Sequence, residues 1–177
     1  MWRLGKREDA AVRGGGWCVL ARIAATALMV CVAGCASSGR NAGEPLVQSL
    51  HLFSVPVAVN LDGQPGPDGF SVRVYAKGLK SSKSVLIPRG KLELLMFDGI
   101  VAEGQSPLPQ PLKTWQFTGS ELKKHAGHSA LGEGYRFTLR WEEARPTRGR
   151  LTIVVRYLPE SGPAIVSAPS SIAMGAK

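Results

Sequence analysis

The sequence has only three cysteines, and all of them lie within its first 35 residues, at Cys18, Cys31 and Cys35. A domain formed by the remaining chain therefore has no pair of thiols for an internal disulfide bond. An exported domain without disulfides depends on an apolar core instead. The 177 residues are enough for one such domain with a further segment at its start.

The sequence also lacks the common signatures of catalysis. It has no G-x-S-x-G nucleophile elbow, no Walker A loop and no Rossmann glycine pattern. Asp98 and Glu103 flank the end of an apolar run, but nothing identifies them as an acid–base pair. We therefore predict a protein that is not an enzyme and needs no cofactor. An enzyme whose site is assembled from distant residues is the alternative.

Histidine is scarce as well. His125 and His128 are three residues apart, and the only other histidine is His51. Because a zinc site needs three or four ligands, this set predicts exposed polar side chains and no zinc site.

One loop carries oxygen-bearing side chains, Asn60, Asp62 and Asp68. Their spacing does not match the calcium loop of an EF-hand, and the same residue types are typical of tight turns. We therefore predict a turn and no metal site.

Residues 1–34 have the pattern of a bacterial export signal. A basic segment precedes an uncharged apolar run, IAATALMVCVA, over residues 23–33. This run is shorter than the about 20 residues that cross a bilayer. The following V-A-G-C, residues 32–35, resembles the lipobox of bacterial lipoproteins. The resemblance implies removal of residues 1–34 and attachment of lipid to Cys35.

The resemblance also implies a location. Ala36 follows the cysteine, whereas an Asp there favours retention in the inner membrane of bacteria with two membranes. We therefore predict a lipid-anchored protein of the cell envelope, on the outer membrane and facing the periplasm. Two or three acyl chains anchor stably, since each buried methylene contributes about 0.8 kcal/mol. Small polar residues predict that residues 35–49 are the lipidated N-terminus and a flexible tether.

The formal net charge is +9, and the chain after residue 35 has 17 basic and 11 acidic side chains. This excess fits an anionic envelope polymer, anionic lipid or an acidic protein partner. An exported protein does not meet nucleic acid, so we predict none as a partner. An ordinary solvated basic surface is the alternative.

From about residue 50 the chain consists of short apolar runs between turn signals, which is typical of an all-β sandwich. We expect strands at residues 55–59, 70–75, 85–87, 92–97, 115–117, 135–141, 151–157 and 164–167. The run at 92–97 is apolar on both faces and predicts a central strand. Trp115 and Trp141 occupy inward positions, where packing in the core is more usual than stacking on a ligand.

Strict alternation in residues 135–141 and 151–157 predicts two half-buried strands. We expect them to pair as a hairpin, with Trp141 opposite Leu151 and Tyr135 opposite Tyr157. This register buries one face of both strands and places Arg136 opposite Arg156.

A short helix is expected at Glu121–His125, with Ser120 as its N-cap and Leu122 pinning it to the core. The predicted organisation is a signal peptide (1–34), a lipidated tether (35–49), a sandwich domain (50–168) and a loose tail (169–177). The fold class is an immunoglobulin- or transthyretin-like sandwich of about eight strands with one short helix.

Six arginines gather on the expected hairpin and its loop: Arg136, Arg140, Arg145, Arg148, Arg150 and Arg156. Arginine binds carboxylates and phosphates through two parallel hydrogen bonds. The cluster therefore predicts an anion-binding surface.

Residues 92–99 (LELLMFDG), 114–117 (TWQF), 139–141 (LRW) and 156–157 (RY) resemble a family of uncharacterised exported proteins from planctomycete-type bacteria. The resemblance covers roughly residues 55–175 and implies the fold but no activity. Val59, Asn60 and Asp62 with residues 72–75 (VRVY) also resemble the TssJ-type lipoproteins of type VI secretion, which are lipidated transthyretin-like sandwiches.

These patterns predict a membrane-anchored lipoprotein that binds or scaffolds a component of the envelope and is not an enzyme. A secretion-machine subunit of the TssJ kind is the alternative from the second resemblance. Neither pattern predicts an oligomeric state.

Overall fold

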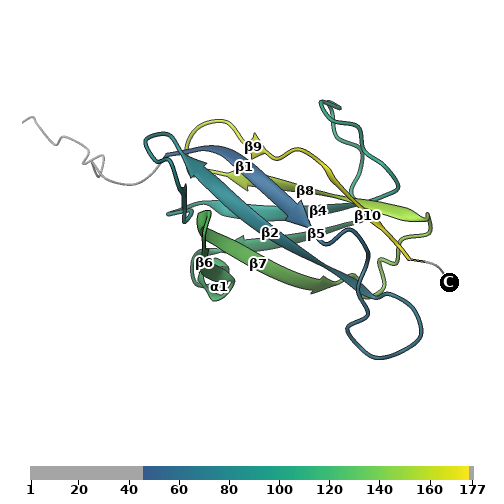
Figure 1. Ribbon diagram of the computed structural model, residues 1–177. Coiled ribbons are helices and arrows are strands. Elements are labelled where there is room, and N and C mark those ends of the chain that lie inside the picture. The colour runs from purple at the N-terminus through teal and green to yellow at the C-terminus, as the bar shows by residue number, and fades with distance from the viewer. Residues whose placement is uncertain (1–45, 176–177) are drawn as a thin grey trace, which may run out of the picture. The chain divides into compact units, whose positions relative to one another are not determined.

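The computed structural model describes residues 46–175, which fold as a sandwich of two sheets with one short helix (Figure 1). The first sheet holds β1 (Val47–Ser54), β2 (Gly69–Gly78), β3 (Ser84–Val85), β7 (Gly132–Arg140) and β6 (Ala126–Ser129). The second sheet holds β10 (Ser170–Ala173), β8 (Arg150–Leu158), β4 (Lys91–Asp98), β5 (Lys113–Thr118) and the short β9 (Ile165–Val166). The prediction of an all-β sandwich is confirmed, with ten strands where about eight were expected.

The core lies between the two sheets and follows the alternation of the sequence. Phe70, Val72 and Val74 of β2 are buried on one face. They pack in one apolar cluster with the inward residues of β7, β4 and β8, which include Phe137, Leu94 and Ile153. Trp141 belongs to the same cluster and Trp115 packs against it, as expected for core aromatics.

The predicted hairpin of residues 135–141 with 151–157 is wrong. β7 pairs with β2 and β6 in the first sheet, whereas β8 pairs with β4 and β10 in the second. The two strands lie in opposite sheets, and each turns its expected face toward the core. Leu139 is only partly buried, and Thr152 and Val154 on the other face of β8 are buried as well. Arg136 therefore lies opposite Arg73 of β2, and Arg156 lies opposite Glu93 of β4.

β4 lies between β8 and β5, which confirms the prediction of a central strand. Its outer face is apolar too, because Leu95 and Phe97 form a second buried cluster with Val101 and Val154. Loop residue Leu108 packs on this cluster. The second sheet is therefore covered on part of its outer face by the proline-containing segment that follows β4.

The helix α1 (Gly119–Lys124) begins and ends earlier than predicted. Its N-cap is Thr118, which makes no side-chain capping bond, so the prediction of Ser120 as the N-cap is wrong. Leu122 is buried, as predicted. The chain after α1 forms the edge strand β6, which the sequence pattern did not predict.

The sandwich extends beyond the predicted bounds of 50–168 at both ends. β1 begins at Val47 and ends at Ser54, so the first strand precedes the valine run of residues 55–59. That run makes only isolated bridges, at Val57 and Val59. The segment predicted as a loose tail contains β10, which pairs with β8 and buries Ile172 completely.

Candidate anion-binding site

Two arginines lie directly opposite each other on the outer face of the first sheet. Arg73 of β2 is the register partner of Arg136 of β7, and both side chains are exposed. Directly opposed residues in an antiparallel pair have Cβ atoms about 4.5–5.5 Å apart, and like charges in this position destabilise the pair. The sheet therefore brings two positive charges together.

Neither guanidinium has an acidic partner within the described part of the chain. The ion pairs found among residues 46–175 involve other cations, among them Arg140, Arg156 and Lys113. The positive charge of Arg73 and Arg136 is thus left to solvent and to any anion that binds. Such a pair is electrostatically prepared to take up negative charge.

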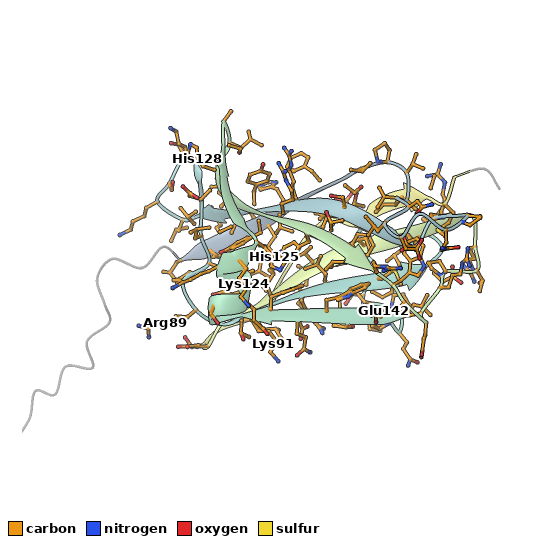
Figure 2. All side chains as sticks on the ribbon, turned by 90° about the horizontal axis from the view of Figure 1, so that it is seen from below. Arg89, Lys91, Lys124, His125, His128 and Glu142 are labelled. Carbon is orange, nitrogen blue, oxygen red and sulfur yellow. The ribbon has the colours of Figure 1, made fainter. Side chains whose placement is uncertain are left out.

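A hollow of about 420 Å³ lies beside this pair. Arg73, Arg136 and Tyr75 line it together with the end of α1 and the edge strand β6. Lys124, His125 and His128 contribute from that side, and Figure 2 shows them following one another from α1 into β6. Five of the side chains around the hollow are basic or can become so.

The floor of the hollow depends on a glycine. Tyr75 is buried although it points outward from β2, and it makes an edge-to-face contact with Phe53. A Cβ on Gly134 would lie 2.6 Å from the Tyr75 ring. Gly134 therefore lets the ring lie against β7 and shapes the base of the hollow.

The two neighbouring histidines have separate surroundings. The His125 ring packs against Phe117 and Phe137, and its Nδ1 lies 3.2 Å from the carbonyl oxygen of Arg136. His128 pairs with Glu133 at 3.1 Å. Among residues 46–175 no group of three or more metal-binding side chains comes together.

Arg140, predicted as part of the anion surface, is neutralised by the loop between β1 and β2. Its Nη2 donates to Asp62 Oδ2 at 2.6 Å. Its Nε lies 2.8 Å from Asp68 Oδ2, a buried oxygen that receives no aligned hydrogen bond, so charge attraction joins this pair.

The same loop is organised by its own polar side chains. Asn60 Oδ1 accepts from the amide of Gly63, Asp62 Oδ1 from that of Gln64, and Asp68 Oδ1 from that of Leu61. The oxygens considered for calcium therefore hold turn amides and Arg140 in this structure.

The remaining arginines lie elsewhere, because β7 and β8 belong to different sheets. Arg156 binds Glu93, with its Nε and Nη2 at 2.8 and 2.7 Å from Glu93 Oε2. Arg150 of β8 reaches Ser171 of β10. Arg145 and Arg148 are exposed on the loop from β7 to β8. The six predicted arginines thus do not form one face of a hairpin, and only Arg136 lines the hollow.

Asp98 binds the loop from β7 to β8. Its carboxylate accepts hydrogen bonds from the Thr147 hydroxyl and from the amides of Thr147 and Arg148. Burial raises the pKa of Asp98, but these hydrogen bonds and the Arg148 charge outweigh it and hold the pKa below its ordinary value. Glu103 instead lines a different hollow, so the two carboxylates have separate surroundings.

A larger hollow of about 900 Å³ lies on the outer face of the second sheet. Its lining is mostly apolar and comes from β4, β8, the loop of residues 101–111 and the segment around β9. The Arg156 side chain borders it, but Glu93 already holds that charge. This hollow therefore offers mostly apolar contact, and Glu103 is the other charged side chain in its lining.

Cys35, the predicted lipidation site, lies outside the described residues. No helix within residues 46–175 has the length and hydropathy needed to cross a membrane. Comparison of the chain with protein-family models, with curated proteins and with solved structures returned no match. The resemblances noted in the sequence therefore stay predictions, and the geometry of the sandwich is the basis for a functional proposal.

Sequence reasoning missed Arg73, the partner that makes Arg136 distinctive. The two residues are 63 positions apart, and only the β2–β7 register brings them together. The alternation of residues 70–75 could have indicated Arg73 as a candidate, because it places this arginine on the outer face of its strand.

Proposed function

We propose that the protein is an exported lipoprotein, anchored through Cys35, whose sandwich domain binds an anionic ligand of the cell envelope without transforming it. The observation that carries the binding function is the opposed pair Arg73 and Arg136, which has no acidic partner among the described residues. The anchor is supported by the apolar run and the V-A-G-C sequence at residues 32–35.

The ligand chemistry follows from the groups that line the hollow. Two guanidinium groups bind planar or tetrahedral oxyanions through paired hydrogen bonds. Lys124 adds a further positive charge at one side. A hollow open to solvent admits a segment of a polymer as readily as a small ion. The class of ligand is therefore a phosphate- or carboxylate-bearing envelope polymer.

The experiment is a calorimetric titration of the purified protein with polyphosphate of defined length. Arg73→Gln and Arg136→Gln should each raise the dissociation constant about tenfold, because a charge-assisted hydrogen bond contributes about 1.5–3 kcal/mol. Arg150→Gln is the matched control, since it removes the same charge from an exposed arginine of the other sheet.

The control should change the dissociation constant less than about twofold, as expected for a distant surface charge. Equal losses in all three variants would show that only net charge matters, and the proposed site would be wrong. Absence of binding by the unaltered protein would remove the anion-binding function itself.

A further inference from the structure

Three exposed leucines lie on neighbouring segments at one end of the sandwich. Leu46 precedes β1, Leu79 follows β2 and Leu131 precedes β7, with 72, 56 and 56% of their surfaces exposed. We call Leu46, Leu79 and Leu131 the leucine tip. Single exposed leucines are ordinary, whereas exposed leucines grouped at one end of a domain are typical of a surface that contacts a membrane or another protein.

Backbone contacts establish that these leucines are neighbours. The Leu79 amide donates to the carbonyl oxygen of Leu46 at 2.8 Å. The Leu131 carbonyl oxygen accepts from the Ser84 hydroxyl at 2.7 Å and from its amide at 3.1 Å. Ser84 in turn pairs with Lys77, two residues before Leu79. The three segments therefore form one continuous end of the first sheet.

Two lysines without an acidic partner among the described residues lie beside the leucine tip. Lys80 and Lys83 are exposed on the turn that carries Leu79, and no carboxylate among residues 46–175 lies within ion-pair distance of either. Figure 2 shows that Arg89 and His128 also lie at this end of the sandwich, but Glu160 and Glu133 pair with them, so the uncompensated charge here is that of the two lysines. Leucines surrounded by lysines are the composition of a surface that enters an anionic membrane interface.

The chain enters the domain at the same end. β1 begins here, because Val47 is the register partner of Gly78. Leu46 follows Cys35 by eleven positions in the sequence. Even fully extended, this stretch of chain reaches at most about 40 Å. A lipid on Cys35 would therefore hold the start of β1 within about 40 Å of the bilayer.

We propose that the leucine tip docks on the surface of the membrane that holds the lipid anchor, with Lys80 and Lys83 against anionic headgroups. This inference rests on the proposed anchor at Cys35. Docking orients the sandwich with its strands rising from the bilayer. The hollow beside Arg73 and Arg136 then opens on the outer face of the first sheet, with His128 on its side nearest the bilayer.

A site-directed label tests the docking. The chain beyond residue 35 has no cysteine, so Leu79→Cys or Leu131→Cys introduces one new thiol for a nitroxide label. The matched control is Ile100→Cys, because Ile100 is also 72% exposed and follows β4 at the opposite end. The mature protein is placed in vesicles of phosphatidylethanolamine with phosphatidylglycerol, and collisions with a water-soluble nickel chelate are measured.

The labels at residues 79 and 131 should become several-fold less accessible to nickel in vesicles, while the label at residue 100 is unchanged. A label at Ser82→Cys should be protected too, and Leu79→Ser with Leu131→Ser in the same chain should abolish that protection. Equal accessibility at residues 79 and 100 would overturn the proposal. Protection without vesicles that grows with protein concentration would identify a second copy as the occupant and would also overturn it.

The mass of the labelled protein reports the anchor separately. One label on the Leu79→Cys protein means that the Cys35 thiol is blocked, and two labels mean that it is free. Free Cys35 would refute the anchor. The comparison of the labels at residues 79 and 100 is then repeated in the Cys35→Ala protein, which has no lipid anchor. If vesicles protect the label at residue 79 but not the label at residue 100, the leucine tip docks on the membrane without the anchor.

Discussion

Arg73 and Arg136 face each other across the β2–β7 pair, and no described acidic side chain neutralises them. Four residues along the same strand, Arg140 has the opposite surroundings, because Asp62 and Asp68 both lie against it. One strand therefore carries a repelled arginine and a neutralised one on the same face. The difference separates a charge without a described acidic partner from a charge that holds the loop between β1 and β2.

This contrast predicts stability changes of opposite sign. Arg136→Gln should raise the free energy of unfolding by a few tenths of a kcal/mol, up to about 1 kcal/mol, because it relieves the repulsion with Arg73. Arg140→Gln should lower it by about 1 kcal/mol, because Asp62 and Asp68 lose their partner. Chemical denaturation at low salt measures both values.

High salt is the control for this comparison. Both changes should shrink as salt screens the exposed charges. A destabilising Arg136→Gln would contradict the description of the pair as repulsive.

The second sheet has a buried acidic group that depends on one arginine. Glu93 is only 3% exposed and holds Arg156 and Gln116. Arg156→Met should lower the free energy of unfolding by about 2 kcal/mol. This is below the usual loss for a broken buried pair, because the Arg156 side chain is partly solvated. Denaturant titration gives the value.

A second substitution separates charge from packing. Glu93→Leu in the Arg156→Met protein should recover most of the loss, since the uncompensated buried charge is then gone. No recovery in the double variant would mean that packing of the arginine stem, rather than the ion pair, stabilises this region.

The hydrogen bonds of Asp98 to the loop from β7 to β8 should make the stability of the protein sensitive to acid. The pKa of Asp98 is lowered in the folded protein, so its contribution to stability is complete above its ordinary pKa and is lost as the pH falls through the folded value. The unaltered protein should therefore lose stability as the pH falls below the ordinary pKa of Asp98, 3.8. Asp98→Asn should be less stable near neutral pH, since the amide is uncharged and only one of its two terminal atoms can accept hydrogen bonds.

Denaturant midpoints at several pH values check this expectation. Asp98→Asn should show a smaller loss on acidification than the unaltered protein. Parallel curves for the two proteins would show that other carboxylates cause the acid sensitivity.

The burial of β10 predicts that the C-terminal segment contributes to the stability of the fold. Ile172 is fully buried in the core between the sheets. Ile172→Ala should therefore cost about 2–5 kcal/mol of unfolding free energy. Val166→Ala is the control, because Val166 is exposed and should change stability by less than about 0.5 kcal/mol. Similar losses at both positions would contradict the packing of β10.

The positions of the strands could be predicted from the sequence better than the way the strands pair. Alternation in residues 135–141 and 151–157 correctly indicated the side chains that face the core. It did not indicate that Thr152 and Val154, on the other face of β8, are buried as well. The alternation does not distinguish two strands paired in a hairpin from two strands that belong to opposite sheets. The connection of nine residues between Arg140 and Arg150 was the available signal, since hairpin loops are usually of 2–5 residues.

The candidate site was predictable only in part. Arg136 was found because basic residues are dense near it in the sequence. Arg73 and Tyr75 were not, because they join the site through strand pairing over a long separation. The acidic partners of Arg140 and Arg156 were missed for the same reason. Local patterns thus indicate charge, whereas topology decides which charges are neutralised.

The most direct test of the proposed lipoprotein is mass spectrometry of its mature N-terminus after membrane fractionation, with Cys35→Ala as the comparison. We expect the unaltered protein in the membrane fraction, beginning at Cys35 and carrying the mass of attached lipid. We expect the variant to lack that lipid. An unaltered protein that begins elsewhere, or that begins at an unmodified Cys35 in the soluble fraction, would contradict the anchor on which the proposed function rests.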